Sequence, residues 1–330
     1  MGARELRGVL IREPGGPDVL AVQEVPDPVP ADGEIIIRNR ATALNRADVL
    51  QRMGFYPPPP GASEVPGLEC AGEVEALGSG VTGIKIGERV FALLTGGGYA
   101  EKVAVPAEVA MPVPDCLDFE QAAAVPEVFT TAYDNLVNHG RIRKGEWALV
   151  HGGGSGVGTA CIQLLKRIGA SVAVTVGSKE KAERCLALGA DAAINYKEEE
   201  FDEAALAATG GRGVDVVLDI IGGAYLERNL KSLAPDGRLV IIGAMGGLQG
   251  EINLGLMLGR RLSIQATTLR ARPVDYKARL ARQIEAEVLP GLADGSIVPV
   301  IDRVFDLSEV AEAHRLMESN AHFGKIVLRI

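Results

Sequence analysis

Two short stretches of the sequence have residues suited to binding a dinucleotide. The first, His151–Gly158, is HGGGSGVG, and it lies between an apolar run typical of a strand and a run with helical apolar spacing. Glycines at Gly153, Gly156 and Gly158 allow the backbone to turn tightly and to approach a pyrophosphate, whose charge meets the N–H groups at the start of the helix. Because strand, glycine turn and helix occur in this order, the motif predicts a dinucleotide site that includes Val157.

The second stretch lies where the ribose of the dinucleotide is expected, about 20 residues beyond the glycines. Counting from Gly158 leads to Gly177 and Ser178, where no carboxylate stands, and these are followed by Lys179 and Lys181. A carboxylate at the end of the strand would bind the 2′-hydroxyl of NAD and repel a 2′-phosphate. Ser178 and Lys181 can instead donate to a 2′-phosphate, so the sequence predicts NADPH. The alternative is that the lysines only form an exposed helix start, although cations are disfavoured there without an anion.

The elements that must position these residues follow from the apolar pattern. Short apolar runs bounded by Gly and Pro fill residues 1–125 and predict a compact β-rich domain. Over residues 126–267, near-continuous apolar runs alternate with helical spacing, which predicts a doubly wound parallel sheet and an α/β fold class. Residues 268–330 predict helices near 275–294 and 307–319 and a last strand that returns to the first domain and completes it.

Composition and charge exclude several classes of protein. The chain has 43 acidic and 34 basic residues and a formal net charge of -9, which argues against a nucleic-acid-binding surface. No run approaches the ~18 apolar residues of a membrane span, and no apolar stretch follows the charged start, so we expect a cytoplasmic protein that does not enter a membrane. The scattered cysteines form no C-x-x-C pair, which is typical of reduced, mostly buried thiols.

Several segments together resemble the zinc-free quinone oxidoreductases of the medium-chain dehydrogenase/reductase superfamily. The similarity is greatest to the zeta-crystallin relatives and, among those, to the tumour-suppressor-inducible type. It implies a GroES-like catalytic domain, formed by residues 1–125 and 268–330, and a Rossmann domain over residues 126–267. The segments are REPGGPDVLAVQEVPDPVP, ALNRADVLQRMGFYPPPPG, VPGLECAGEV, GGGSGVG, INY and AHRLMESNAHFGKIVL, so the resemblance covers nearly the whole chain.

The resemblance also bears on metal binding. Zinc alcohol dehydrogenases of this superfamily have a Gly-His-Glu motif where this chain has Gly67, Leu68 and Glu69, and a zinc-binding Cys where it has Asn45. A catalytic zinc needs about three protein ligands. Because two of the usual ligands and the four-cysteine structural lobe are missing, we expect no metal.

Without a Lewis acid, the site must bind an acceptor that takes a hydride with modest help. A quinone fits because its reduced product is aromatic. Asn45 would donate its side-chain amide to a quinone oxygen, and Tyr56 would stack on the ring and offer its hydroxyl. Asp48 is expected to fix the local loop rather than transfer a proton. The alternatives are that Asn45 is a turn residue and that Tyr56 packs beside the prolines.

The remaining cofactor contacts are implied by the resemblance. Thr131 would hold the nicotinamide end, and Tyr196 would lie against the adenosine phosphate. The loop 243–247 would flank the nicotinamide ribose, while segments 268–270 and 323–325 would close a cleft that holds the quinone between the domains. The residues assigned in these segments are Gly243, Met245, Gly246, Thr268, Leu269, Phe323 and Lys325. All four histidines, His139, His151, His314 and His322, are expected to be structural, the first and last two because no carboxylate or Cys partner is at ligand spacing.

Two other functions remain open. One is the reduction of an activated C=C bond, such as that of an enone, by the same zinc-free chemistry. The other is a non-catalytic role as an NADPH-binding crystallin or RNA-binding protein, although the acidic charge counts against RNA. In either case the apolar segment 261–267 predicts a sheet edge that pairs with a second copy, so we expect a homodimer.

Overall fold

The computed structural model describes residues 5–330, so residues 1–4 of the expected first domain lie outside the described residues. The chain divides into two compact units. The first combines the residues up to Thr130 with Arg270–Ile330, and the second is Thr131–Leu269. Helix α3 (Pro126–Tyr133) runs across the first division, whereas the sequence placed that boundary at 125/126 and the second one at 267/268.

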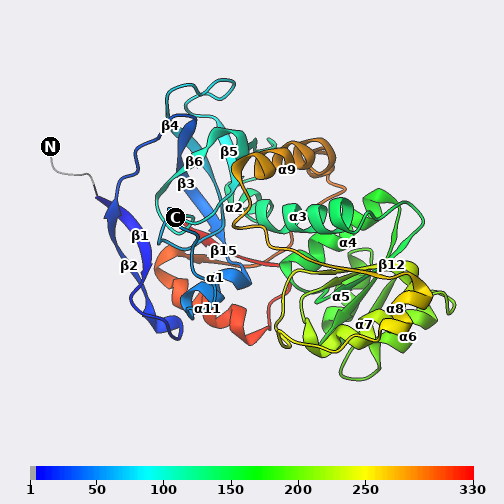
Figure 1. The fold of residues 1–330 in the computed structure, drawn as a ribbon. Helices are drawn as coiled ribbons and strands as arrows, with labels where there is room; N and C mark the ends of the chain where they lie inside the picture. Colours follow the sequence, from blue (N-terminus) through cyan, green and yellow to red (C-terminus); the bar gives the residue numbers. More distant parts are fainter. Residues whose placement is uncertain (1–4) are drawn as a thin grey trace. The chain divides into compact units, whose positions relative to one another are not determined.

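A seven-stranded sheet forms the centre of the first unit. Its strands follow the order β14-β15-β3-β4-β5-β7, and β6 also pairs with β3. Ile35 and Ile37 of β3 are fully buried and belong to one hydrophobic cluster of this sheet. The last strand pairs antiparallel with β3, so the C-terminal segment lies in the sheet of the first unit (Figure 1). The bounds are β3 (Glu34–Ala43), β4 (Glu69–Leu77), β5 (Arg89–Leu93), β6 (Lys102–Pro106), β7 (Ala110–Pro112), β14 (Ile301–Asp306) and β15 (Lys325–Arg329).

Helices and a hairpin complete the first unit. The helix predicted over 275–294 is in fact two helices, α9 (Val274–Glu287) and α10 (Leu289–Asp294). Pro290, in the first turn of α10, lacks the N–H that a continuous helix would need, so the helix is interrupted at Val288. The other elements are β1 (Glu5–Ile11), β2 (Leu20–Pro26), α1 (Arg46–Arg52), α2 (Phe119–Ala123), α11 (Val310–Ser319) and the short helices Pro17–Val19, Ala107–Val109 and Leu307–Glu309.

The second unit is built on a six-stranded parallel sheet. Its order is β10-β9-β8-β11-β12-β13, so the chain moves outward in one direction from β8 and then in the other direction from β11. This is the strand order of the Rossmann fold, which confirms the predicted α/β class. The bounds are β8 (Trp147–His151), β9 (Ser171–Val176), β10 (Ala192–Asn195), β11 (Val214–Asp219), β12 (Leu233–Ile241) and β13 (Ser263–Ala266).

Helices cover this sheet, as the near-continuous apolar strands predict. One hydrophobic cluster joins Leu149, Val217 and Leu239 of the sheet to Phe201 of α6 and Leu230 of α7. Figure 1 shows α6, α7 and α8 on one side of the sheet and α4 on the other. The helices are α4 (Gly156–Ile168), α5 (Lys179–Ala187), α6 (Phe201–Ala208), α7 (Leu226–Ser232), α8 (Leu254–Arg260), a π-helix (Asp134–His139) and the short helix Gly223–Tyr225.

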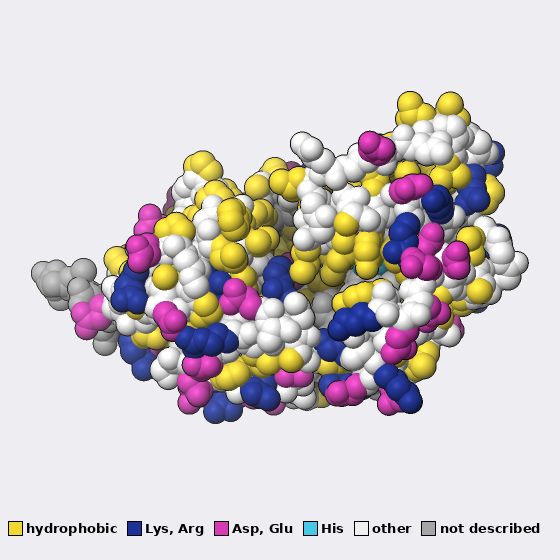
Figure 2. Space-filling view, turned by 90° about the horizontal axis from the view of Figure 1, so that it is seen from below, with side chains coloured by type: hydrophobic (Ala, Val, Ile, Leu, Met, Phe, Trp, Pro, Cys, Tyr) yellow, Lys and Arg dark blue, Asp and Glu magenta, His cyan; other side chains and the backbone are white. Residues whose placement is uncertain are grey.

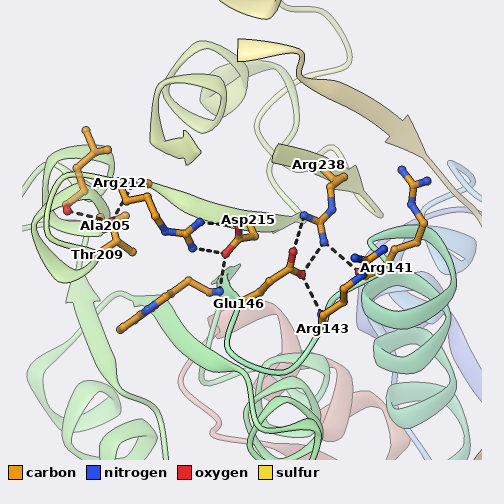
Figure 3. Close-up of polar contacts among 11 residues, drawn as sticks. Arg141, Arg143, Glu146, Ala205, Thr209, Arg212, Asp215 and Arg238 are labelled. Atoms are coloured by element: carbon orange, nitrogen blue, oxygen red, sulfur yellow. Dashed lines mark hydrogen bonds and ion pairs between the residues drawn. The ribbon is translucent and has the colours of Figure 1, made fainter. Parts of the chain in front are cut away.

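Charged side chains form ion pairs and hydrogen bonds that connect neighbouring parallel strands near their amino ends (Figure 3). The carboxylate of Asp215 accepts from the backbone N–H of Trp147 at 2.8 Å and pairs with Arg212. Next to it, the carboxylate of Glu146 pairs with Arg238 at 2.8 Å. These contacts lie at the end of the sheet opposite the carboxyl ends of the strands, where ligands bind in this architecture.

The surface and the helices bear on two of the excluded classes. On the face shown in Figure 2, Lys and Arg side chains lie among Asp and Glu side chains rather than in one basic area. Within residues 5–330, no helix is long and apolar enough to cross a membrane.

Candidate functional site

The glycine turn lies between β8 and α4. Ser155 is the N-cap of α4, and its hydroxyl accepts from the backbone N–H of Gly158 at 3.0 Å. A Cβ atom added at Gly158 would lie 2.3 Å from the carbonyl oxygen of Gly152, so only glycine fits there. Gly156 and Val157 are the first two residues of α4 and have no carbonyl one turn earlier in the helix to bond. The turn therefore offers N–H groups at the positive end of a helix, which suits a pyrophosphate.

The basic cluster follows the neighbouring strand β9. Ser178 is the N-cap of α5, and its hydroxyl accepts from the backbone N–H of Lys181 at 3.3 Å. The Tyr196 side chain is exposed, and its hydroxyl oxygen would lie 2.6 Å from a Cβ atom added at Gly177. The structure thus brings Gly177, Ser178, Lys181 and Tyr196 to one place at the carboxyl end of the sheet.

The two clusters of the second unit are neighbours. A Cβ atom added at Gly153 would lie 3.1 Å from the Sγ atom of Cys185. Burial raises the pKa of the Cys185 thiol to about 12, and the ammonium group of Lys181 opposes that rise. Cys185 belongs to α5, the helix that also carries Lys181, so this helix borders the glycine turn.

The loops after β11 and β12 are held against each other. The backbone N–H groups of Met245 and Gly246 donate to the carbonyls of Ile220 and Ile221, at 3.2 and 2.7 Å. A Cβ atom at Gly243 would lie 3.0 Å from the carbonyl oxygen of Ile220, so this glycine also borders the first loop. The predicted loop 243–247 therefore has a fixed position beside the end of β11.

Asp219 is a residue that the sequence interpretation missed. It ends β11, is fully buried, and accepts from the backbone N–H groups of Ile221 and Gly222 at 2.7 and 3.0 Å. Burial raises its pKa to about 6. The signal was an acidic residue at the end of the apolar run VDVVLD. Its carboxylate shapes the loop that holds residues 243–247.

Thr131 and the segment after β13 are connected through Asn135. The Asn135 amide donates to the carbonyl of Thr131 at 2.9 Å, and its carbonyl oxygen accepts from the Thr267 hydroxyl at 2.6 Å. Thr268, which follows, is exposed, and Leu269 is half-buried. Both therefore adjoin the carboxyl end of β13, where the sequence interpretation expected ligand contacts.

The histidines of the second unit are structural in one case and paired in another. His151, at the end of β8, is buried with ring nitrogens 2.7 Å from the Asn229 side-chain oxygen and 3.0 Å from the Thr175 hydroxyl. Burial lowers its pKa to about 4. His139 does have a carboxylate partner, contrary to the prediction, because the π-helix places its Nε2 atom 3.6 Å from Asp134. Residues five apart share a face in such a helix.

The buried His151 predicts loss of stability in acid. The unfolded chain binds a proton near the ordinary pKa of 6.5 and the folded chain only near 4, so the unfolded state holds more protons between these values. The free energy of unfolding should therefore fall by about 3 kcal/mol from pH 6.5 to 4 on account of this residue. Urea unfolding of His151→Gln across this range should show a flatter pH dependence, and an unchanged slope would contradict the assignment.

In the first unit, a buried ion pair lies at the residues expected to line the acceptor site. The ammonium group of Lys325 donates to Glu69 at 2.7 Å, to the side-chain oxygen of Asn45 at 2.8 Å and to the carbonyl of Leu44 at 2.8 Å. The side chains of Lys325 and Glu69 are 3% and 0% exposed. All three N–H groups of the Lys325 ammonium are thus engaged within the protein.

Asn45 is similarly occupied. Its side-chain amide donates to Glu69 at 2.8 Å and to the carbonyl of Ala43 at 3.3 Å. Both N–H groups of the Asn45 amide are therefore engaged within the protein, so neither is free for the predicted donation to a quinone oxygen. The second oxygen of Glu69 accepts from the backbone N–H of Glu127 at 2.8 Å. Lys325 thus neutralises the buried carboxylate of Glu69, and Asn45 donates a further hydrogen bond to it.

Asp48 holds three segments together. Its carboxylate accepts from the backbone N–H groups of Asn45 and Gly67, at 2.8 and 3.2 Å, and from the Tyr99 hydroxyl at 3.1 Å. Burial raises the pKa of Asp48 to about 6, and the hydrogen bonds from Asn45 and Tyr99 oppose the rise. The geometry agrees with the expected role in fixing the loop.

Tyr56 is half-buried, and Arg270 covers one face of its ring. The guanidinium carbon of Arg270 lies 5.5 Å from the ring centroid, and its Nη1 atom donates to the carbonyl of Tyr56 at 3.3 Å. No residue that the structure describes accepts from or donates to the Tyr56 hydroxyl. Stacking on an acceptor is therefore open only to the other face. Phe323 is buried, and its backbone N–H donates to Asp302 at 2.9 Å, which fixes the turn before β15.

Comparison with known proteins identifies the family. Residues 31–115 match a family described as "Alcohol dehydrogenase GroES-like domain", and residues 156–286 match one described as "Zinc-binding dehydrogenase". The chain is similar to a quinone oxidoreductase of Rattus norvegicus, with 33% identity over 330 residues that cover 99% of this chain and 98% of that protein. The chain belongs to the quinone oxidoreductase family of the medium-chain dehydrogenase/reductase superfamily.

Other members of the superfamily extend the comparison. A crystal structure of Escherichia coli quinone oxidoreductase complexed with NADPH has a TM-score of 0.88 and 33% identity, covering 98% of this chain and 100% of that one. The chain is also 35% identical over 325 residues to one subunit of a phenolphthiocerol/phthiocerol polyketide synthase of Mycobacterium tuberculosis. That match covers 97% of this chain but only 14% of the longer relative. This quinone oxidoreductase family member therefore corresponds to a small part of the polyketide synthase.

The name of one matched family implies zinc, but the residues of this family member do not fit a metal ion. Within the described part of the chain, no three His, Cys, Asp or Glu side chains converge in a way that could hold one. Glu69 is the carboxylate of the segment where zinc relatives have Gly-His-Glu. Its Oε1 atom already accepts hydrogen bonds from Lys325 and Asn45. Burial raises the pKa of the neighbouring Cys70, which disfavours the thiolate that a metal requires.

Proposed function

We propose that this oxidoreductase uses NADPH to reduce quinones by hydride transfer without a metal ion. The observation that supports this most directly is the pair of clusters at the carboxyl ends of β8 and β9, where a helix start lies beside Ser178 and Lys181 and Gly177 takes the place of an acid. The NADPH complex of the E. coli relative supports the same cofactor. The finer resemblance to the tumour-suppressor-inducible type stays a hypothesis, based on the sequence segments alone.

Different residues of the second unit would bind different parts of the cofactor. The N–H groups of Gly156 and Val157 would bind the pyrophosphate, because they have no partner within α4. Ser178 and Lys181 would bind the 2′-phosphate, and Tyr196 would lie against the adenosine phosphate. The nicotinamide end would meet Thr131, Gly243, Met245, Gly246, Thr268 and Leu269. When bound, NADPH supplies the hydride from C4 of its nicotinamide.

The acceptor would meet Tyr56 in the first unit. Its hydroxyl has no protein partner among the described residues and can donate to a quinone oxygen on which negative charge develops. Asp48 and Asn45 would support the acceptor site without contacting the acceptor, because they fix the segments around the buried Glu69. Phe323 and Lys325 belong to this supporting structure rather than to the cofactor contacts.

The proposal is tested by the rate of NADPH oxidation with an ortho-quinone, with an enone of similar size and with no acceptor. We expect turnover with the quinone, and Tyr56→Phe should lower kcat/KM by about tenfold or more because it removes one donor to the acceptor oxygen. Phe55→Leu, at the exposed neighbour of Tyr56, is the matched control. A higher rate with the enone would favour the double-bond reductase, and oxidation with neither would favour a non-catalytic NADPH-binding protein.

Metal independence has its own test. Because Leu68 and Asn45 stand where zinc relatives have ligands, we expect the quinone reductase rate to be unchanged after dialysis against a strong chelator. Elemental analysis should find less than one zinc per chain. A stoichiometric zinc whose removal abolishes turnover would contradict this expectation.

We further propose a homodimer joined through the edge strand β13. This strand ends the parallel sheet, and its outer edge has no strand partner within residues 5–330. On the preceding helix α8, Leu254 and Leu258 lie one turn apart and are 67% and 79% exposed, which is apolar surface that a second copy would cover. Light scattering over a dilution series should give twice the chain mass. Ile264→Pro should shift the mass toward the monomer, whereas Ile264→Val should not.

A further inference from the structure

A pocket lies wholly within the first unit. It has a volume of about 670 Å³, which lies in the range of small-molecule sites. Its walls come from β2, β5, β6, the segment 59–65, the loop 94–97 and the start of α9. Most of these walls are apolar, with Val25, Val65, Leu94, Val103 and Val109 among them.

One wall of this pocket is polar and positively charged. Lys277 lines the pocket and is 6% exposed, and its ammonium donates to the Thr95 hydroxyl at 2.7 Å and to the carbonyl of Arg270 at 2.6 Å. One N–H of the ammonium remains. The Thr95 hydroxyl, which accepts from Lys277, keeps its own proton to donate. The Ser63 hydroxyl accepts from the backbone N–H of Val65 at 3.2 Å and likewise keeps a proton.

A second cation stands directly behind this wall. Arg270 is 5% exposed, and its Nε atom donates to the carbonyl of Thr95 at 2.8 Å. Its Nη2 atom is buried with no hydrogen-bond partner and would lie 3.6 Å from a Cβ atom added at Gly96, which lines the pocket. Burial and the nearby Arg270 charge lower the pKa of Lys277 to about 8.

Within the described residues, the cations of this wall have no carboxylate in direct contact, and the charge of Asp48 attracts Arg270 only from a distance. Among the residues that the structure describes, neither Arg270 nor Lys277 forms an ion pair with a carboxylate. Lys102, on another wall, is different because it pairs with Asp27 at 3.0 Å and Glu75 at 2.8 Å. Two adjacent buried cations without a directly paired anion are costly, and a bound anion would offset that cost.

We infer that this pocket binds a carboxylate on an apolar body, with the carboxylate at Lys277, Thr95 and Ser63. The positive field of Arg270 favours the anion over a neutral group, and the apolar walls take the rest of the molecule. Arg270 also contacts Tyr56, so one residue connects this pocket to the residue proposed for the acceptor. The ligand is either an acidic acceptor itself or an acidic effector, and the site stands whether or not quinones are reduced.

The test is a calorimetric titration of the whole chain without NADPH, using 2-naphthoate and the neutral 2-naphthalenemethanol. We expect the acid to bind at least about tenfold more tightly, because its carboxylate gains charge-assisted hydrogen bonds. Equal affinity for the two compounds would overturn the inference without recourse to any variant.

Variants locate the preference within the pocket. Lys277→Gln keeps an N–H donor for Thr95 and Arg270 but loses the charge, so the preference for the acid should vanish while the alcohol binds as before. Lys102→Met, at the lysine whose charge is already paired, should keep the preference. A preference that survives Lys277→Gln would refute the assignment.

Steady-state inhibition by 2-naphthoate then separates the two kinds of ligand. Inhibition that is competitive with the quinone would identify the pocket as part of the acceptor site. A change in rate that is not competitive would identify an effector site. If the protein reduces no quinone, the titration alone decides on the pocket, so failure of the proposed activity and failure of this inference are distinguishable.

Discussion

Lys325→Met is expected to lower the free energy of unfolding by about 3–5 kcal/mol, because it leaves the carboxylate of Glu69 buried without its cation. Lys325 and Glu69 are almost completely shielded from water, and the ammonium also satisfies Asn45 and the carbonyl of Leu44. No water can replace these contacts in so closed a site. The measurement is urea unfolding monitored by circular dichroism. The dependence of the free energy of unfolding on urea concentration is compared between variants.

Two controls define the origin of the loss. Lys325→Met combined with Glu69→Gln removes both charges, so it should recover much of the lost stability. Arg329 is on the same strand as Lys325 and forms an ion pair with Glu120, which Arg329→Met removes. Because the arginine side chain is 58% exposed, the loss in the free energy of unfolding should stay below about 1 kcal/mol. Similar losses for Lys325→Met and Arg329→Met would show that the buried pair has no special weight.

The second large effect concerns the choice of cofactor. Lys181→Ala should weaken NADPH binding by about 10- to 100-fold, because a charge-assisted hydrogen bond to the 2′-phosphate is worth ~1.5–3 kcal/mol. NADH binding should change little, since NADH lacks that phosphate. Titrations of each nucleotide, followed by protein fluorescence, measure both constants.

Lys179 supplies the matched control for this experiment. It begins the same helix, but its side chain is 85% exposed and lies 4.0 Å from Glu183. Lys179→Ala should therefore alter NADPH binding much less than Lys181→Ala. Equal losses of NADPH and NADH on Lys181→Ala would mean that this lysine stabilises the helix rather than binding the phosphate.

The parts of the fold that local pattern determines were predictable. The apolar strands and the glycine turn before α4 are contiguous in sequence, so periodicity and spacing indicated the Rossmann sheet and its carboxyl-end site. The break at Val288 was missed because the apolar spacing continues past it, although Pro290 was the available signal. The site residues Gly177, Ser178 and Tyr196 came together because each follows the end of its strand.

The buried polar contacts were not predictable from local pattern. Glu69 and Lys325 are 256 positions apart, and nothing in either neighbourhood shows that they meet. Asn45 was assigned a role toward the acceptor for the same reason, since its partners Glu69 and Lys325 lie on strands that are distant in sequence. Arg270 was expected only as part of a closing segment, and its contact with Tyr56 depends on a chain path of 214 residues.

The interrupted path of the first unit has a consequence for synthesis. A ribosome that makes the chain completes every strand of the parallel sheet, through Ala266, before it adds β15. The second unit therefore has all its strands early, whereas Glu69 waits for its cation until Lys325 emerges. We expect nascent chains halted at about residue 310 to hold a protease-resistant second unit beside an open, chaperone-dependent first one, because domains generally fold as units during translation.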